Sequence, residues 1–513
     1  MSTDGLSLPP PDSAVNARTV AREGGWAGLF NVLGAIIRYG NAIIVTRVLG
    51  AKLYGLYVLA NRVVTVISVP SGLGLPTSLV HFIATYADTG QWGRLRWFIR
   101  AAFRTAVISS GLGAVLILVL SPWASHSLFE KDGLLLPLSG LALALPFWVL
   151  YQVCAGALQG LKAIRGKVFI ERIAHPLVFS AMLLIAGFYF RSLEYVLVCF
   201  FAAAVMVFIL GLTWLRKRLA ALPAPPPSPP MWGHLLSFST PVMFMQFLNY
   251  FITWSDILVL GHFGSAANVG VYGIASTLGQ GVSMPTDAMG TSLAPSFSGL
   301  AGRGEKAELR RLFHTSTRWI FLLATFAGLG LILAGPAILR LFGRDFEEGY
   351  LALCLLAVGQ MISAAYGANG TLITMTGHPK VNLYNAIFLG PGNLALCLFL
   401  IPRYGLVGAA ASAAFSWTIL NATRAVEVWA LLRIGPWDRT ILKPLAALTA
   451  GAVCGGAAFH FIHPLVGAAV GLSVYAGLWY LLRPEPEDWD MLKRAWAKLR
   501  RSPMGGETGD GRR

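Results

Sequence analysis

Apolar residues run along the chain in stretches of roughly 18 to 25, and short polar segments separate these stretches. A helix needs about 20 apolar residues to cross the hydrocarbon of a bilayer, and in lipid each segment must satisfy its own backbone hydrogen bonds. The sequence lacks the ten-residue segments of alternating polarity that are typical of membrane barrels. The pattern predicts an all-α polytopic membrane protein with about fourteen transmembrane helices. We expect these helices at 24–46, 56–80, 98–121, 134–158, 168–190, 193–215, 236–260, 268–295, 317–341, 350–373, 382–402, 405–431, 443–461 and 463–482.

Polar segments divide these helices into larger units. The segment RKRLAALPAPPPSPPMW follows the sixth helix, and proline-rich sequence of this kind forms an extended, semi-rigid spacer. We therefore expect two six-helix lobes and two additional helices. The predicted units are a cytoplasmic tail at 1–23, an N-lobe at 24–215, a cytoplasmic linker at 216–235, a C-lobe at 236–431, the last two helices at 432–482 and a basic cytoplasmic tail at 483–513.

The two halves of the chain resemble each other in sequence. GLYVLA, which begins at Gly55, aligns with GVYGIA, which begins at Gly270, at a shift of 215. TSL at Thr77 aligns with TSL at Thr291 at a shift of 214. Because six expected helices separate the copies, both run in the same direction and are related by a pseudo-two-fold axis along the membrane normal. Two such lobes facing each other across a cleft are typical of transporters.

Composition and charge also favour a membrane protein. Hydrophobic residues make up 56% of the chain and charged residues 12%, against roughly 25% charged residues in an ordinary soluble domain. A net charge of +17 would suggest nucleic acid binding in a soluble protein, but here the expected loops place roughly 27 basic residues on one side and about 7 on the other. By the positive-inside rule both termini are cytoplasmic, and we expect no nucleic-acid partner.

Motifs for enzymatic chemistry are missing from the sequence. The five cysteines lie in apolar segments, with no CxxC and no histidine at metal-ligand spacing, so we expect packing residues and no metal site. The segment SGLGLP at 71–76 lacks the lysine of a phosphate-binding loop, and neither GxSxG nor HExxH occurs. The longest outer loop, about 121–133, is too short for the active site of a saccharide polymerase or ligase. We predict that the protein is not an enzyme, has no catalytic residue and needs no cofactor, although a proton or sodium gradient could drive it.

Polar residues form matching stripes in two of the expected helices. The first helix carries Asn31, Gly34, Arg38 and Asn41 at helical spacing, and its counterpart carries Gln246, Asn249, Thr253 and Asp256 at a shift of 215. Charge at bilayer depth costs a few kcal/mol, so these residues face a watery cavity or a partner and not lipid. The stripes predict a substrate cavity. The alternative is a structural ion pair between Arg38 and Asp256 across the lobes.

Other polar residues extend this candidate site. Asn61 and Arg62 join the predicted cavity residues Arg38, Asn31, Asn41, Gln246 and Asn249. Three carboxylates could exchange a proton or bind sodium for coupling, namely Asp256, Asp287 and Glu171. Glu171 is followed by Arg172 and His175, and this triplet is either functional or a self-satisfied ion pair.

Several charged residues have simpler interpretations. Arg424 and Glu427 are spaced i, i+3 on one helix, and we expect them to pair with each other. Arg104 and Arg318 lie near cytoplasmic helix ends, where we expect their side chains to extend to the interface.

The segment from Thr46 to Leu95 resembles the first two-helix unit of the polysaccharide-transporter branch of the MOP flippase superfamily. The resemblance rests on Arg47-Val48-Leu49-Gly50, Tyr54-Gly55-Leu56-Tyr57, Gly72, Gly74 and Phe82-Ile83-Ala84. The second-half counterpart VLGHFGSAANVGVYGIA is also similar to the family's pattern. The first half departs from that pattern at one point, where Ala51-Lys52 replaces the acidic residue that is usual after Leu-Gly-Pro. The resemblance spans the first twelve helices and marks the family better than it marks the substrate.

This resemblance implies a function. Relatives flip an undecaprenyl-pyrophosphate-linked sugar chain across the bacterial cytoplasmic membrane for surface polysaccharide such as the O-antigen of lipopolysaccharide, by ion-coupled alternating access in a V-shaped cavity. By position, Arg38 and Arg62 would hold the anionic headgroup, since guanidinium groups suit pyrophosphate. Expected partners are the lipid-linked glycan, membrane lipids and other polysaccharide-assembly membrane proteins. The alternatives are a lipid II flippase, a multidrug exporter of the same superfamily and, more remotely, a membrane glycosyltransferase or ligase.

Overall fold

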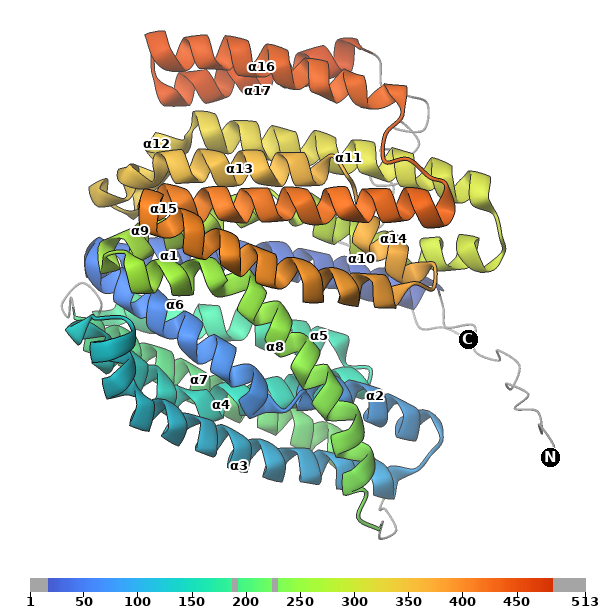
Figure 1. Cartoon of the computed structure of the whole chain (residues 1–513). Coiled ribbons are helices and arrows are strands. Elements are labelled where there is room, and N and C mark those ends of the chain that lie inside the picture. Colours follow the sequence, from blue (N-terminus) through green and yellow to red (C-terminus); the bar gives the residue numbers. More distant parts are fainter. Residues whose placement is uncertain (1–16, 187–191, 224–228, 483–513) are drawn as a thin grey trace, which may run out of the picture.

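The computed structural model describes residues 17–186, 192–223 and 229–482, and every regular element within them is helical (Figure 1). Much of the two predicted tails, 1–23 and 483–513, and the middle of the predicted linker lie outside the described residues. Side chains are described from Leu33 onward, so the predicted cavity residue Asn31 also lies outside them. The all-α prediction is confirmed.

The first half of the chain forms one helical bundle, the N-lobe. Its helices contact chiefly one another, with α4 packed between α3, α7, α2 and part of α1. Its elements are α1 Ala17–Gly72, α2 Leu75–Asp88, α3 Trp92–Trp123, η1 Ala124–Leu128, η2 Asp132–Leu134, α4 Leu135–Gly160, α5 Ile164–Val168, the π-helix η3 Phe169–Ala174, α6 His175–Ala186 and α7 Leu193–Ala220.

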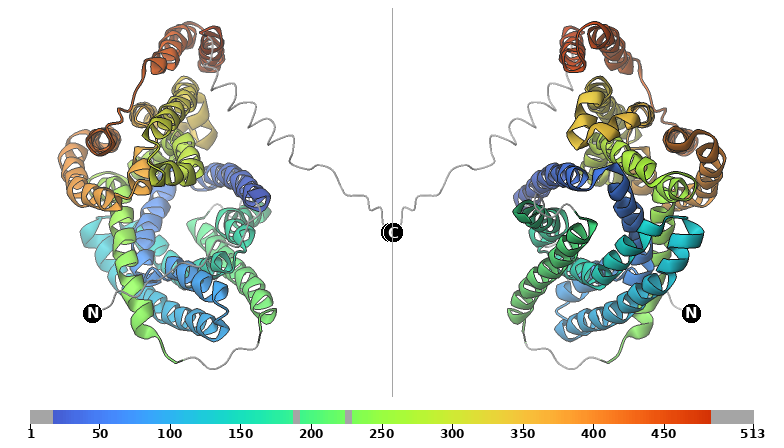
Figure 2. Two further views of the ribbon diagram at one scale, coloured as in Figure 1. Left: turned by 90° about the vertical axis from the view of Figure 1, so that its right-hand side faces the viewer. Right: turned by 90° about the vertical axis from the view of Figure 1, so that its left-hand side faces the viewer.

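The second half forms the C-lobe and a terminal hairpin. Figure 2 shows the hairpin of α16 and α17 at one edge of the molecule, beside α11. The elements are α8 Trp232–Phe263, α9 Ala266–Gly281, α10 Met284–Gly302, α11 Lys306–Leu333, α12 Gly335–Phe342, η4 Arg344–Gly349, α13 Tyr350–Ala364, α14 Asn369–Met375, α15 Pro379–Leu432, η5 Arg439–Ile441, α16 Leu442–Phe461 and α17 Pro464–Leu481.

The predicted number of fourteen spans is not confirmed. Ten helices of the described chain are long and apolar enough to cross a membrane, or eleven when the bent pair of α13 and α14 counts as one span. Two of these ten segments, α1 and α15, each contain two helices that meet at a glycine. Gly50 (φ 69°, ψ 174°) and Gly405 (φ 54°, ψ −127°) adopt backbone conformations that side chains disfavour, which lets the chain reverse with almost no loop.

The outside of the bundle is apolar in the way that contact with lipid requires. Along α3, large apolar side chains point outward and are more than half exposed, including Val107, Ile108, Leu112, Val115 and Val119. A soluble monomer rarely exposes so continuous an apolar strip. These helices are therefore parts of a multi-pass membrane protein.

Corresponding glycines of the two halves adopt corresponding conformations. Gly90 and Gly304, which the sequence pairs at a shift of 214, both have positive φ, at 68° and 71°. Each glycine lies at the short turn before the next long helix, α3 or α11. The repeat in the sequence is therefore also a repeat in local structure.

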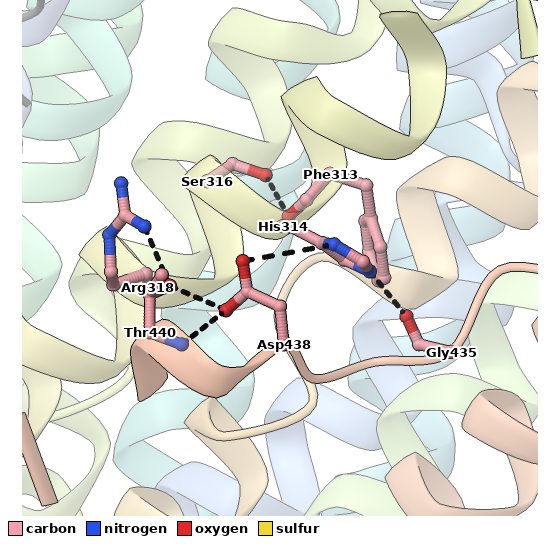
Figure 3. A network of polar contacts seen from close by, with 7 residues as sticks. All are labelled: Phe313, His314, Ser316, Arg318, Gly435, Asp438 and Thr440. Carbon is pink, nitrogen blue, oxygen red and sulfur yellow. Dashed lines mark hydrogen bonds and ion pairs between the residues drawn. The ribbon is translucent and has the colours of Figure 1, made fainter. Parts of the chain in front are cut away.

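The loop before α16 is fixed to α11 by a polar network (Figure 3). Asp438 accepts hydrogen bonds from the backbone N–H and the hydroxyl of Thr440, at 3.0 and 2.5 Å, and Arg318 donates to the same hydroxyl at 2.6 Å. A ring nitrogen of His314 lies 2.9 Å from the carbonyl oxygen of Gly435. Arg318 is only 5% exposed, so the prediction that its side chain extends to the interface is wrong.

Candidate functional site

Two arginines come together on the N-lobe, one from α1 and one from η3. The packing of these elements depends on Gly34, because a Cβ atom there would lie 2.5 Å from the backbone oxygen of Arg172. Arg38 follows Gly34 by one helical turn, and its charge and that of Arg172 act on each other. The predicted stripe of α1 thus faces η3 and α6, and it places two like charges side by side.

Neither arginine has a partner. Within the described chain no carboxylate forms an ion pair with Arg38 or Arg172, and neither side chain makes a hydrogen bond to protein. Both side chains are exposed. Arg172 lies on the single turn of π-helix in this segment, and such bulges inside α-helices are frequent at functional sites. Two exposed guanidinium groups whose like charges act on each other favour the binding of an anion between them.

The neighbours of this pair have structural roles. Asn41, a predicted cavity residue, is buried, donates to the carbonyl oxygen of Pro176 at 2.9 Å and accepts from Ser180. It therefore holds α1 against α6. Glu171 lies 3.8 Å from Lys167 on the preceding turn, and its charge acts on that of Arg172 without a direct ion pair. The direct ion pair of Glu171 is thus with Lys167 and not with a member of the triplet.

A second charged centre lies between the lobes. The guanidinium of Arg62, on α1, stacks over the ring of Trp254, on α8, with 3.5 Å from its central carbon to the ring centroid. Asp256, two residues further along α8, is 6% exposed and accepts a hydrogen bond of 2.5 Å from the hydroxyl of Tyr272. The charges of Arg62 and Asp256 act on each other without a direct ion pair among the described atoms.

The contacts of Asp256 test the predicted alternative of an ion pair between Arg38 and Asp256. The partners of Asp256 are Tyr272 and the backbone N–H of Ile257, and the basic residue whose charge acts on it is Arg62. The alternative that Arg38 pairs with Asp256 is therefore wrong, because Arg38 lies against η3 within its own lobe.

Two predicted cavity residues lie near this boundary. Gln246 donates to the hydroxyl of Thr77 at 3.0 Å and so joins α8 to α2. Asn61 lies next to Arg62 on α1, and its backbone oxygen accepts a hydrogen bond from Thr65. Both residues lie outside the lining of the large cavity described next.

A cavity of about 730 Å³ lies within the C-lobe. Residues of α8, α10, α14 and both arms of α15 line it, together with the turn before α14. Four residues of the predicted stripe and coupling set belong to this lining: Asn249, Thr253, Asp256 and Asp287. The cavity therefore brings together the second polar stripe and two of the three candidate coupling carboxylates.

Arg424 also lines this cavity, although its spacing from Glu427 predicts a local ion pair. The carboxylate of Glu427 accepts a hydrogen bond from Asn385 at 2.8 Å, and its charge acts on Arg424 without a direct ion pair within the described chain. The guanidinium instead lies over Gly370, where a Cβ atom would approach it to 3.1 Å. The prediction that Arg424 and Glu427 pair with each other is therefore wrong, and Gly370 provides the room that keeps the arginine at the cavity wall.

The described residues contain no group of three or more His, Cys, Asp or Glu side chains that could hold a metal ion. The chemistry of the site is thus that of arginines, amides, hydroxyls and a few carboxylates. Such groups can bind an anionic and hydroxyl-rich ligand, and nothing in their arrangement forms a nucleophile with an activating base.

Comparison with known proteins agrees with this chemistry. The sequence profile of the family described as polysaccharide biosynthesis protein matches residues 20–301, and that of the MatE family matches residues 241–398. A Haloferax volcanii protein described as a probable low-salt glycan biosynthesis flippase, Agl15, is 21% identical over 77% of this chain and 80% of its own length. A second protein from this organism, described as a probable flippase, AglR, is 24% identical over 40% of this chain and 42% of its own length.

Solved structures share the fold. The lipid II flippase MurJ in an inward closed conformation matches with a TM-score of 0.69 at 11% identity, over 89% of this chain and 98% of its own. An inward-facing multidrug resistance transporter of the MATE family matches with a TM-score of 0.65 at 16% identity, over 78% and 94%. The relatives are transporters and not enzymes. Because the first profile covers more than half of the residues, the chain belongs to the polysaccharide biosynthesis protein family, within the MOP flippase superfamily.

Proposed function

We propose that this protein flips a lipid-linked oligosaccharide, carried on undecaprenyl pyrophosphate, across the bacterial cytoplasmic membrane for surface polysaccharide such as O-antigen. The observation that carries the proposal is that two exposed arginines of the N-lobe, Arg38 and Arg172, lie close enough for their charges to act on each other and have no ion pair within the described chain. Two adjacent guanidinium groups match the charge and the acceptor geometry of a pyrophosphate. Arg62 is held against Trp254 and is less available to a ligand.

The asymmetric placement of basic residues supports an orientation with both termini in the cytoplasm. In that orientation the contact of Gly55 with Ala266 and Gly270 closes the outer end. The C-lobe cavity includes Met375 and Pro379, which flank the turn at the opposite, cytoplasmic end. The substrate would therefore enter from the inner leaflet in this conformation, and other polysaccharide-assembly proteins would supply it.

Coupling to an ion gradient belongs to the same proposal. Asp256 is the strongest candidate, because its buried carboxylate lines the C-lobe cavity and also acts on Arg62 of the N-lobe. Neutralising Asp256 with a proton or sodium ion would weaken an attraction between the two lobes. Asp287, also at the cavity, and Glu171 are secondary candidates.

A second candidate function is export of cationic drugs. The MatE profile matches the part of the chain that builds most of the cavity, and Asp256 and Asp287 give that cavity two carboxylates. This function needs no anion site, so it leaves Arg38 and Arg172 without a role.

The proposal can be tested with the full-length protein in proteoliposomes that contain undecaprenyl pyrophosphate linked to N-acetylglucosamine. The measurement is the fraction of lipid whose sugar becomes accessible to a glycosidase added on the opposite side. We expect Arg38→Ala and Arg172→Ala each to slow flipping by about tenfold or more, because each removes a charge-assisted contact. Arg100→Ala, which changes an exposed arginine of α3, is the control and should leave the rate unchanged.

Either of two results would overturn this function. One is wild-type flipping by both Arg38→Ala and Arg172→Ala. The other is transport of a cationic dye by wild-type protein without any movement of the lipid-linked sugar, which would favour the drug exporter.

A further inference from the structure

Two amides that line the C-lobe cavity have their nitrogen atoms occupied by protein acceptors. Asn382 donates both of its amide hydrogens inside the protein, to the carbonyl of Gly370 and to the hydroxyl of Thr374, each at 2.9 Å. Asn421 likewise donates both, at 2.6 and 3.0 Å. With its nitrogen occupied, Asn421 leaves only its amide oxygen for a ligand, and this oxygen can only accept hydrogen bonds.

Several polar groups of the cavity wall are without a partner in the described chain. The buried Oδ1 atom of Asn382 accepts no hydrogen bond, and the buried Nε atom of Arg424 donates none. The hydroxyl of Thr371 and the side-chain amide of Asn249 also line the cavity and make no hydrogen bond to protein. The accessible groups of Thr371 and Asn249 are free to bind a ligand, so the cavity is suited to a polar one.

The balance of charge in the cavity identifies the kind of ligand. Among the described lining residues, Asp256 and Asp287 carry negative charge and Arg424 carries positive charge. A pyrophosphate would meet two carboxylates and one guanidinium here, whereas it would meet two guanidinium groups at Arg38 and Arg172. A neutral ligand with many hydroxyl donors matches the amide and carboxylate acceptors without that repulsion.

The remaining lining suits a sugar. Trp417 contributes an indole ring on α15, next to the amide-rich wall. The volume of about 730 Å³ lies within the ordinary range of ligand pockets, about 300 to 1,000 Å³. A sugar ring is rigid, carries many hydroxyl donors and has one apolar face, so it fits a wall of amides beside an indole ring.

We infer that the C-lobe cavity binds the glycan of the substrate and selects a neutral, hydroxyl-rich saccharide over an acidic one. The two lobes thus divide the substrate, with the headgroup phosphates on the N-lobe and the sugar in the C-lobe. This inference rests on the proposed function, and the two can fail separately.

The test measures binding of three lipids to detergent-purified full-length protein by native mass spectrometry. The lipids are undecaprenyl pyrophosphate alone, the same lipid with N-acetylglucosamine and the same lipid with glucuronic acid. We expect wild-type protein to bind the N-acetylglucosamine lipid most tightly, by about tenfold over the lipid without sugar, since several neutral hydrogen bonds add up to that gain.

Two variants address the cavity. Ala386→Trp fills it from α15 and should abolish the gain from the sugar while leaving binding of the sugar-free lipid intact. Retained binding of the sugar-free lipid also reports that this variant folds. Thr371→Val keeps the shape of the side chain, removes one free hydroxyl and should lower the gain about two- to tenfold. The matched control is Ala395→Trp, which places the same ring at an exposed position of α15 outside the cavity.

The outcomes separate this inference from the proposed function. A sugar gain that survives both Ala386→Trp and Thr371→Val, or tighter binding of the glucuronic acid lipid, would overturn the sugar site. Loss of the gain in both variants supports the site whatever Arg38→Ala does to the sugar-free lipid. Unchanged binding of that lipid by Arg38→Ala would instead count against the proposed headgroup site.

Discussion

Gly55 and Gly270 pack backbone against backbone where α1 crosses α9. A Cβ atom on Gly55 would lie 1.7 Å from the carbonyl oxygen of Ala266, and one on Gly270 would lie 2.3 Å from that of Ala51. The four residues form two small-xxx-small pairs, a spacing that lets helices approach closely in membranes. Because the two glycines occupy equivalent positions in the repeat, the pseudo-two-fold axis passes through this contact.

Replacing Gly55 with leucine should force the lobes apart at this end. A Leu side chain cannot fit within 1.7 Å of backbone, so α1 and α9 must separate. We expect a longer distance between spin labels at positions 52 and 267, with flipping reduced by about tenfold or more because the closed state is lost.

A control distinguishes this effect from a general effect of bulk in α1. Gly40 belongs to the same element, and a Cβ atom there would meet nothing within 4 Å. Gly40→Leu should therefore leave the distance unchanged. An unchanged distance in Gly55→Leu would show that this contact does not hold the lobes together.

Long-range structure was predictable where the sequence repeats. The shift that aligns Gly55 with Gly270 identified two parallel lobes, and these glycines meet in the structure. Hydrophobic length identified the membrane helices but not the tight reversals at Gly50 and Gly405, where one glycine replaces a loop. A run of apolar residues does not reveal a change of direction that needs no polar segment.

Site residues were less predictable because their partners come from other helices. The spacing of Arg424 and Glu427 suggested a local pair, yet Asn385 from the other arm of α15 binds Glu427. Arg38 was found from its stripe, whereas its companion Arg172 depends on the close approach of η3 to Gly34. Spacing along one helix describes one face, and it does not say which face of a distant helix lies opposite.

Asp256→Asn tests coupling. The amide can still accept the hydrogen bond from Ile257, so we expect the fold to survive while the negative charge near Arg62 is lost. Flipping should persist at a reduced rate and no longer respond to a pH or sodium gradient across proteoliposomes.

Tyr272→Phe separates charge from packing. This variant keeps the carboxylate of Asp256 but removes the 2.5 Å hydrogen bond that it accepts. We expect a loss of about 1–3 kcal/mol in stability, as for a buried acceptor that loses its donor, with the gradient response retained. A gradient response that persists in Asp256→Asn would rule out this residue as the coupling carboxylate.

Arg62 and Trp254 should couple across the lobes. A guanidinium that stacks on an indole ring at 3.5 Å contributes about 0.5–2 kcal/mol, and lysine cannot reproduce the flat stacking. We expect a double-mutant cycle with Arg62→Lys and Trp254→Leu, read out as thermal stability in detergent, to give a coupling energy in that range. Strict additivity of the two changes would mean that the stacked geometry contributes nothing to stability.

The network around Asp438 should hold the terminal hairpin in place (Figure 3). Asp438→Ala removes the acceptor of two hydrogen bonds from Thr440, which itself binds the buried Arg318. We expect a loss of about 1–2 kcal/mol and faster proteolysis between α15 and α16. Arg439→Ala changes an exposed neighbour and should leave the cleavage rate at the wild-type value. Equal rates for the two variants would assign no fixing role to the network.

Lys131 gives a prediction about pH. Its ammonium donates to the carbonyl oxygens of Phe129, at 2.9 Å, and of Gly261 at the end of α8, and burial lowers the pKa of this lysine. Between that lowered pKa and the ordinary value of about 10.4, the unfolded chain binds more protons than the folded one, so this group makes stability rise with pH. Lys131→Met removes the titrating group.

The difference in melting temperature between wild type and Lys131→Met should therefore shift in favour of the wild type as pH rises toward about 10.4. Subtracting the variant's curve removes the contribution of other lysines and tyrosines that titrate in this range. Lys52→Met, at an exposed position on the second arm of α1, is the matched control and should show no such shift relative to wild type. A difference that is constant with pH, or that moves against the wild type, would mean that the Lys131 ammonium is not penalised by burial between the lobes.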